Sequence, residues 1–187
     1  MLSSARYESV TMKSLAEQLA AYSAYHHDPR NTITHFFGVP LVIFAIFVPL
    51  GWLRFVHDQA LPYTGATLFY VVVFIYYLCL DWRVALLQAP FTLTILWFAD
   101  RVSLWPFGES LLAFASAFVG GWVVQLVGHA FEGKRPALAD NLLQIFNAPL
   151  FLTVEVALWL GFRKDLQSAA ATEPAPQNAN PKMAAAK

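Results

Sequence analysis

The feature that most constrains this chain is a series of five long apolar segments. They cover, approximately, residues 39–56, 61–80, 84–99, 111–127 and 148–162. A helix needs about 20 apolar residues, within a range of about 17–25, to cross the hydrocarbon core of a bilayer. The first, second and fourth segments fit this requirement well. The third contains Gln88 and Pro90, the fifth contains Glu155, and both are short, so it is left open whether these two span.

The composition agrees with a membrane protein. The 187 residues are 58% hydrophobic and only 13% charged, whereas soluble domains carry about 25% charged residues. The formal net charge is zero, which gives no electrostatic reason to expect a nucleic-acid partner. Cys79 is the only cysteine, so an internal disulfide is excluded. We therefore expect an all-α membrane protein, a bundle of four to five apolar helices.

The domain organisation is predicted to be simple. Residues 1–10 are expected to form a flexible N-terminus and residues 11–165 a single helical membrane domain. Residues 166–187 are rich in Ala, Pro, Asn and Gln, which predicts a disordered tail. Lys13 and Glu17 precede any hydrophobic core, unlike a secretory signal. The first apolar segment is therefore expected to act as an uncleaved anchor.

An amphipathic helix is predicted before the first apolar segment. Ser14 followed by Glu17 fits a capping box, which marks a helix start. Four residues then recur at helical spacing and share one face: Leu15, Leu19, Tyr22 and His26. This helix is expected to lie on the membrane or on the bundle, with His26 at its C-terminal end.

A second helix is predicted to begin at Asp28-Pro29, as N-cap and first helical residue. Asn31 and His35 are four residues apart on this helix and share a face. The break at Asp28-Pro29 can fold the end of the preceding helix back, so that His26 approaches His35.

The other half of a candidate site follows from topology. Gln125, His129 and Glu132 are spaced by four and three residues near the end of the fourth apolar segment, so they line one helical face. If four helices span in alternation, the start of the first and the end of the fourth lie at the same membrane face. His35 would then lie at the same depth as His129. Lysine and arginine are more frequent on this side, which favours the cytoplasmic face.

These residues predict a metal site at one membrane face. Polar groups inside a membrane are costly unless they pair, bind metal or meet water. Imidazole and carboxylate ligands with open positions are typical of non-haem iron(II) oxygenases, and zinc accepts the same ligands. A third interpretation is that the histidines only form hydrogen bonds. His57, beside Asp58, is expected to be such an interface residue, whereas it is left open whether His27 or Glu155 joins the site.

The two histidine blocks resemble a known family. The first block is Tyr22…Tyr25-His26…Pro29…Asn31…His35…Pro40, and the second is Gly121-Trp122…Gln125…Gly128-His129…Phe131-Glu132…Arg135-Pro136-Ala137-Leu138. Further matches are Asn141-Leu142…Gln144 and Ala148-Pro149…Glu155. Together they resemble the membrane-protein family of the fungal 2-hydroxy-palmitate dioxygenase, over about residues 19–162.

The resemblance implies an Fe(II)-dependent dioxygenase of fatty acid α-oxidation, with molecular oxygen as co-substrate. A long-chain 2-hydroxy fatty acid would be cleaved to the acid one carbon shorter, without 2-oxoglutarate. The matching positions imply His26, His35 and His129 as metal ligands, with Glu132 as a fourth ligand or a base. Asn31 and Gln125 would orient ligands or substrate.

Several further expectations accompany this hypothesis. The acyl chain would enter laterally from membrane lipid, and its carboxylate could be attracted by Arg30, Lys134 or Arg135. No protein partner is implied. A bacterial inner membrane is expected, or the endoplasmic reticulum if the chain is eukaryotic. Two alternatives stay open, namely a zinc-dependent membrane hydrolase acting on a lipid and a non-catalytic lipid-binding or transport protein.

Overall fold

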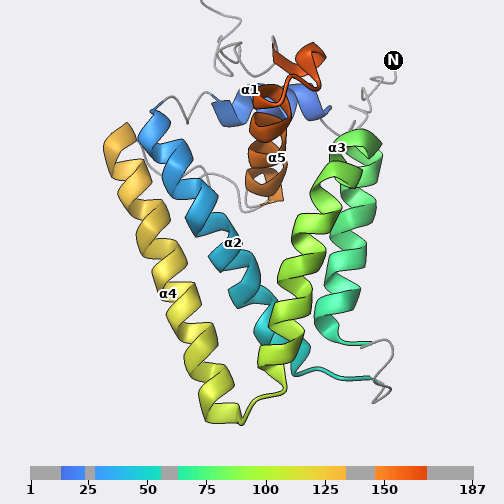
Figure 1. Ribbon diagram of the computed structural model, residues 1–187, viewed down its shortest axis with the longest axis vertical. Coiled ribbons are helices and arrows are strands. Elements are labelled where there is room, and N and C mark those ends of the chain that lie inside the picture. The colour runs from blue at the N-terminus through green and yellow to red at the C-terminus, as the bar shows by residue number, and fades with distance from the viewer. Residues whose placement is uncertain (1–13, 24–27, 56–62, 134–145, 168–187) are drawn as a thin grey trace, which may run out of the picture.

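The computed structural model describes residues 14–23, 28–55, 63–133 and 146–167, and the named elements in these ranges are all helices (Figure 1). They are α1 (Leu15–Ser23), α2 (Pro29–Gly51), α3 (Gly65–Ser103), α4 (Phe107–Glu132), α5 (Asn147–Trp159) and the short 3₁₀ helix η3 (Lys164–Leu166). The prediction of an all-α bundle is confirmed. The predicted flexible N-terminus and nearly all of the predicted tail lie outside the described residues.

Both predicted helix starts are confirmed. The Ser14 N–H donates to Glu17 Oε2 at 2.7 Å, and the Glu17 N–H donates to Ser14 Oγ at 3.3 Å, which is the reciprocal pattern of a capping box. Asp28 Oδ1 accepts the N–H of Arg30 at 2.8 Å, with proline at the first position of α2. From there α2 continues unbroken, so the polar stretch around His35 and the first apolar segment form one helix.

Helix α3 is a helical hairpin. Asp81 has φ −161° and ψ 107°, which is not helical, and the two arms on either side of it run in opposite directions (Figure 1). Asp81 Oδ1 accepts the N–H groups of Arg83 at 2.9 Å and of Val84 at 3.1 Å, so it caps the second arm. The sequence interpretation did not identify this cap, although aspartate between two apolar segments is a typical N-cap residue.

The lengths of the two arms correct the expectation about which segment spans. The first arm starts only at Gly65, after the N-cap Thr64, and is too short to count as a span. The second arm, 82–103, is long enough. It extends beyond the apolar segment because Arg54 Nη2 bonds to Asp100 Oδ1 and Ser103 Oγ, each at 2.8 Å, which satisfies the polar groups at its end.

Three helices are long and apolar enough to cross a membrane, namely α2, the second arm of α3 and α4. Only 11% of the most apolar stretch of α4 is buried within the protein, and Leu112, Val119 and Val123 are all more than half exposed. A contiguous apolar surface of this kind is unusual in a soluble monomer and is expected for a helix that faces lipid.

Helix α5 is too short to cross. Its 13 residues rise about 20 Å, whereas the hydrocarbon core is about 30 Å thick. It lies between α2 and α3, near α1 (Figure 1). After α5 the chain returns to the hairpin turn of α3, since Arg163 Nη2 pairs with Asp81 Oδ2 at 2.8 Å. Leu150, Phe151 and Val154 of α5 belong to a buried core shared with α1, α2 and α3.

Helices α2 and α4 form the closest pair in the bundle. They lie side by side in opposite directions, so that the start of α2 and the end of α4 are at the same end of the molecule (Figure 1). Alternation of four spanning segments predicted that these two ends share a face. They do so here because the first arm of α3, although too short to count as a span, runs back along the bundle before the second arm begins (Figure 1). This arrangement brings the two histidine-containing segments together.

Candidate functional site

Two buried histidines meet between α2 and α4. The ring centres of His35 and His129 are 5.1 Å apart, with the ring planes at 88°. His35 is 3% exposed and His129 is 6% exposed. The predicted approach of these two residues, from distant parts of the sequence, is therefore confirmed.

The tautomer of His35 is set by its own helix. Its Nδ1 lies 3.0 Å from the main-chain oxygen of Asn31, one turn earlier. Because a carbonyl oxygen can only accept, Nδ1 must carry the hydrogen. The lone pair of the neutral ring is then on Nε2, which is the arrangement of a histidine prepared to bind a metal ion.

Glu132, at the end of α4, contacts the first turn of α2. Its Oε1 accepts the main-chain N–H of Asp28 at 2.9 Å, and its Oε2 accepts Nδ2 of Asn31 at 2.6 Å. The first N–H groups of a helix have no partner within the helix, and a negative charge there is favourable. Glu132 therefore joins the two helices at the end where the histidines meet.

Glycines allow α2 and α4 to approach this closely. A Cβ atom added at Gly128 would overlap Thr34 Oγ1 and Asn31 Oδ1. A Cβ atom at Gly38 would lie 2.6 Å from Cγ of Gln125, which places the Gln125 side chain against α2. Both glycines are thus required by the space between the helices. Thr34, whose hydroxyl donates to the main-chain oxygen of Asn31 at 2.7 Å, was missed by the sequence interpretation.

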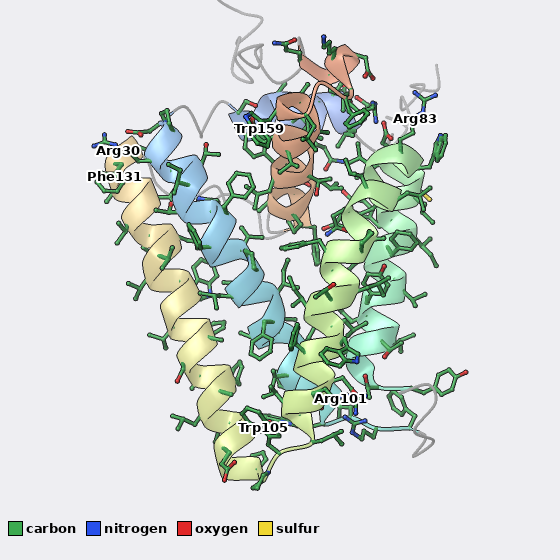
Figure 2. All side chains as sticks on the ribbon, in the orientation of Figure 1. Arg30, Arg83, Arg101, Trp105, Phe131 and Trp159 are labelled. Atoms are coloured by element: carbon green, nitrogen blue, oxygen red, sulfur yellow. The ribbon has the colours of Figure 1, made fainter. Side chains whose placement is uncertain are left out.

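Arg30 lies at the outer edge of the same region. Its guanidinium binds the carboxylate of Asp28, with Nη2 to Oδ2 at 2.7 Å, and lies 4.5 Å from the ring centre of Phe131 (Figure 2). This hydrogen bond from Arg30 lowers the pKa of the Asp28 carboxyl. The Arg30 side chain is 64% exposed, so it is accessible to an anionic group arriving from outside.

Several predicted site residues are not placed at this pair. His26, His27, His57, Lys134 and Arg135 lie outside the described residues, so their roles stay predictions. Glu155 is half-buried on α5, and no hydrogen bond to it is found among the described residues. Asn31, Gln125 and Glu132 are brought to the α2–α4 contact.

The chemistry of the histidine pair fits a metal ion. A ring bound through nitrogen at about 2.1 Å has its centre about 3.2 Å from the metal, so two rings about 100–110° apart have centres about 5 Å apart. The 5.1 Å between His35 and His129 is compatible with a shared ion, and it also lies within the range of about 4.5–7 Å that is usual for an edge-to-face contact between two rings. Within the described ranges, no three His, Cys, Asp or Glu side chains are grouped closely enough to hold one ion. His26, the third imidazole of the predicted site, lies outside the described residues.

Comparison with known proteins agrees with these observations. The family model described as 2-hydroxy-palmitic acid dioxygenase Mpo1-like matches residues 12–159. The 2-hydroxy-palmitic acid dioxygenase MPO1 of Saccharomyces cerevisiae is 33% identical over 156 residues, which cover 82% of this chain and 86% of the yeast protein. No solved structure matches the chain. With the match extending over most of its length, the chain belongs to the 2-hydroxy-palmitic acid dioxygenase Mpo1-like family.

Proposed function

We propose that this protein is an iron(II)-dependent dioxygenase that cleaves a long-chain 2-hydroxy fatty acid to the acid one carbon shorter. The observation that carries the proposal is the buried pair His35 and His129, in a chain whose family is described as a 2-hydroxy-palmitic acid dioxygenase. Imidazole ligands with open positions suit non-haem iron chemistry.

The residues around the pair have assigned roles in this proposal. His35 and His129 would hold the metal together with His26. When bound, iron would bring the hydroxy acid and oxygen together and allow electrons to pass between them. The reaction balances in atoms and electrons without a further co-substrate, because one hydroxy acid and one molecule of oxygen give the shortened acid, carbon dioxide and water. Gln125, one helical turn deeper than His129 and against Gly38, contacts the substrate near its head group.

The membrane setting suits the substrate. The site lies at one end of α2 and α4 (Figure 1). Exposed apolar side chains, among them Leu112, Val119 and Val123, continue along α4 towards its other end. An acyl chain could lie along such a surface in the lipid while its carboxylate stays at the polar end. Arg30, exposed at that end, supplies a charge that attracts the carboxylate from the membrane interface.

The test is purification without oxygen, metal analysis, and incubation with 2-hydroxypalmitate and oxygen. We expect iron bound to the protein and formation of the fifteen-carbon acid only when both iron and oxygen are present. Zinc in place of iron, with release of a lipid hydrolysis product, would instead support the hydrolase alternative. Absence of bound metal and of product over several chain lengths would refute both.

A further inference from the structure

We propose that Glu132 is a positioning residue, which orients His35 through Asn31, and that it is not itself a ligand of the metal. The inference rests on the proposed function, since it assumes that His35 binds iron. It assigns one of the two roles that the sequence left open for Glu132.

The first argument is that the carboxylate of Glu132 is directed at the first turn of α2. Its two oxygens accept different donors, the main-chain N–H of Asp28 at 2.9 Å and Nδ2 of Asn31 at 2.6 Å. Glu132 thus caps one helix from the end of another. His35 lies one turn further along α2 than Asn31. Glu132 therefore binds the residue that begins the helical turn ending at His35.

The second argument is the continuity of the bonds from Glu132 to His35. A carboxylate can only accept, so the Asn31 amide must present its nitrogen to Glu132. Asn31 is 0% exposed and its Oδ1 is directed at Gly128, which leaves the side chain little freedom. The main-chain oxygen of the same residue accepts Nδ1–H of His35 at 3.0 Å. Fixing Asn31 therefore fixes the His35 ring.

The third argument is the difference between the histidines and the acid. His35 and His129 approach as two ligands of one ion would, but no third His, Cys, Asp or Glu among the described residues joins them in a metal-binding group. Glu132 is among those described, and both of its carboxylate oxygens accept hydrogen bonds from the first turn of α2. Groups that orient a ligand in this way typically change metal affinity by about 10- to 100-fold when they are removed.

The experiment compares iron affinity, by anaerobic titration in detergent, for Glu132→Gln, Glu132→Ala, Asn31→Ala and the double alanine variant. Glutamine can still accept from Asp28 N–H, and its amide can donate to Asn31 Oδ1 after the Asn31 amide flips by about 180°, which exchanges its nitrogen and oxygen without needing more space. We therefore expect Glu132→Gln to bind iron nearly as tightly as the native protein. A loss equal to that of His129→Ala would overturn the proposal, and this comparison remains decisive if Glu132→Ala does not fold.

The alanine variants test the connection itself. Each single change should weaken iron binding by about 10- to 100-fold, and the double change by little more than either one, because both remove the same connection. The proposal would be overturned if Asn31→Ala bound iron as tightly as the native protein. It would also be overturned if the loss of iron affinity in the double variant were the product of the two single losses. Circular dichroism and gel filtration in detergent control for folding.

A metal-free measurement separates this inference from the proposed function. If the native protein binds no iron, the proposed function fails. The native protein, Glu132→Ala, Asn31→Ala and the double alanine variant are then compared by thermal unfolding without metal. Non-additive losses would support the connection between Glu132 and Asn31, whereas additive losses would refute it.

Discussion

Gly128→Ala is the most informative change to the packing of the two histidine helices. In a helix interior, alanine is more favourable than glycine by up to about 1 kcal/mol, so a gain in stability would ordinarily be expected. At Gly128 the new methyl group would instead overlap Thr34 Oγ1 and Asn31 Oδ1. Asn31 is fully buried and bonded to Glu132, so it cannot move aside without losing that bond.

The magnitude follows from a comparison with Gly120→Ala. Gly120 lies in the same helix, and nothing lies within 4 Å of a Cβ atom added there. The gain in helix propensity is common to both variants. The difference between their free energies of unfolding is therefore the cost of overpacking at Gly128, which is about 1–3 kcal/mol. For a chain of this size, about 2–4 °C in Tm corresponds to each kcal/mol. Gly128→Ala should therefore unfold well below Gly120→Ala.

The assay is thermal unfolding in detergent, followed by the helical circular dichroism signal, together with the iron content of each variant. Gly128→Ala should also bind less iron, because moving α4 away from α2 separates His35 from His129. Equal Tm values for the Gly120 and Gly128 variants would refute the reasoning, since they would show that the two helices do not approach as closely as described.

Three further outcomes are expected. Arg54→Ala should destabilise the protein by about 1–3 kcal/mol, because Asp100, 13% exposed, would lose its partner. The iron content per folded chain should not change. A stability equal to that of the native protein in thermal unfolding would contradict this expectation. Burial raises the pKa of Asp81, but the hydrogen bonds from Arg163 and from main-chain N–H groups outweigh it, so that the pKa is lowered. The stabilisation should thus be complete above the unfolded value of about 3.9 and lost as the pH falls through the lower folded value; Asp81→Asn should show a smaller loss of Tm between pH 6 and pH 3, and an unchanged loss would count against the ion pair. Finally, omission of 2-oxoglutarate should leave product formation from 2-hydroxypalmitate intact, whereas an iron chelator should abolish it; a requirement for 2-oxoglutarate would exclude the proposed electron balance.

Local signals in the sequence predicted the helix starts well. Ser14 with Glu17, and Asp28 with the following proline, are caps whose partners lie within three residues, so their geometry depends on short-range chemistry. The approach of His35 and His129 was also predicted, from four apolar segments that alternate in direction. The directions are as predicted, although the first arm of α3 is too short to count as a span (Figure 1).

Other features depend on contacts that no local pattern contains. The second arm of α3 extends beyond its apolar stretch because Asp100 pairs with Arg54. The hydrogen-bond donors that the Glu132 carboxylate meets could not be predicted, because Asp28 and Asn31 lie on another helix across the interface. Periodicity placed Glu132 on the correct helical face, but periodicity carries no information about the partner helix.

The central claim is that His35 and His129 share one iron ion. Its most direct test is the iron content of anaerobically loaded protein, with X-ray absorption at the iron edge to count imidazole ligands, for the native chain, His35→Ala, His129→Ala and the control His57→Ala. We predict one iron per chain with imidazole scattering in the native protein and in His57→Ala, and loss of iron in the other two variants. Iron retained with unchanged scattering in His35→Ala and His129→Ala, or no iron in the native chain, would contradict the claim.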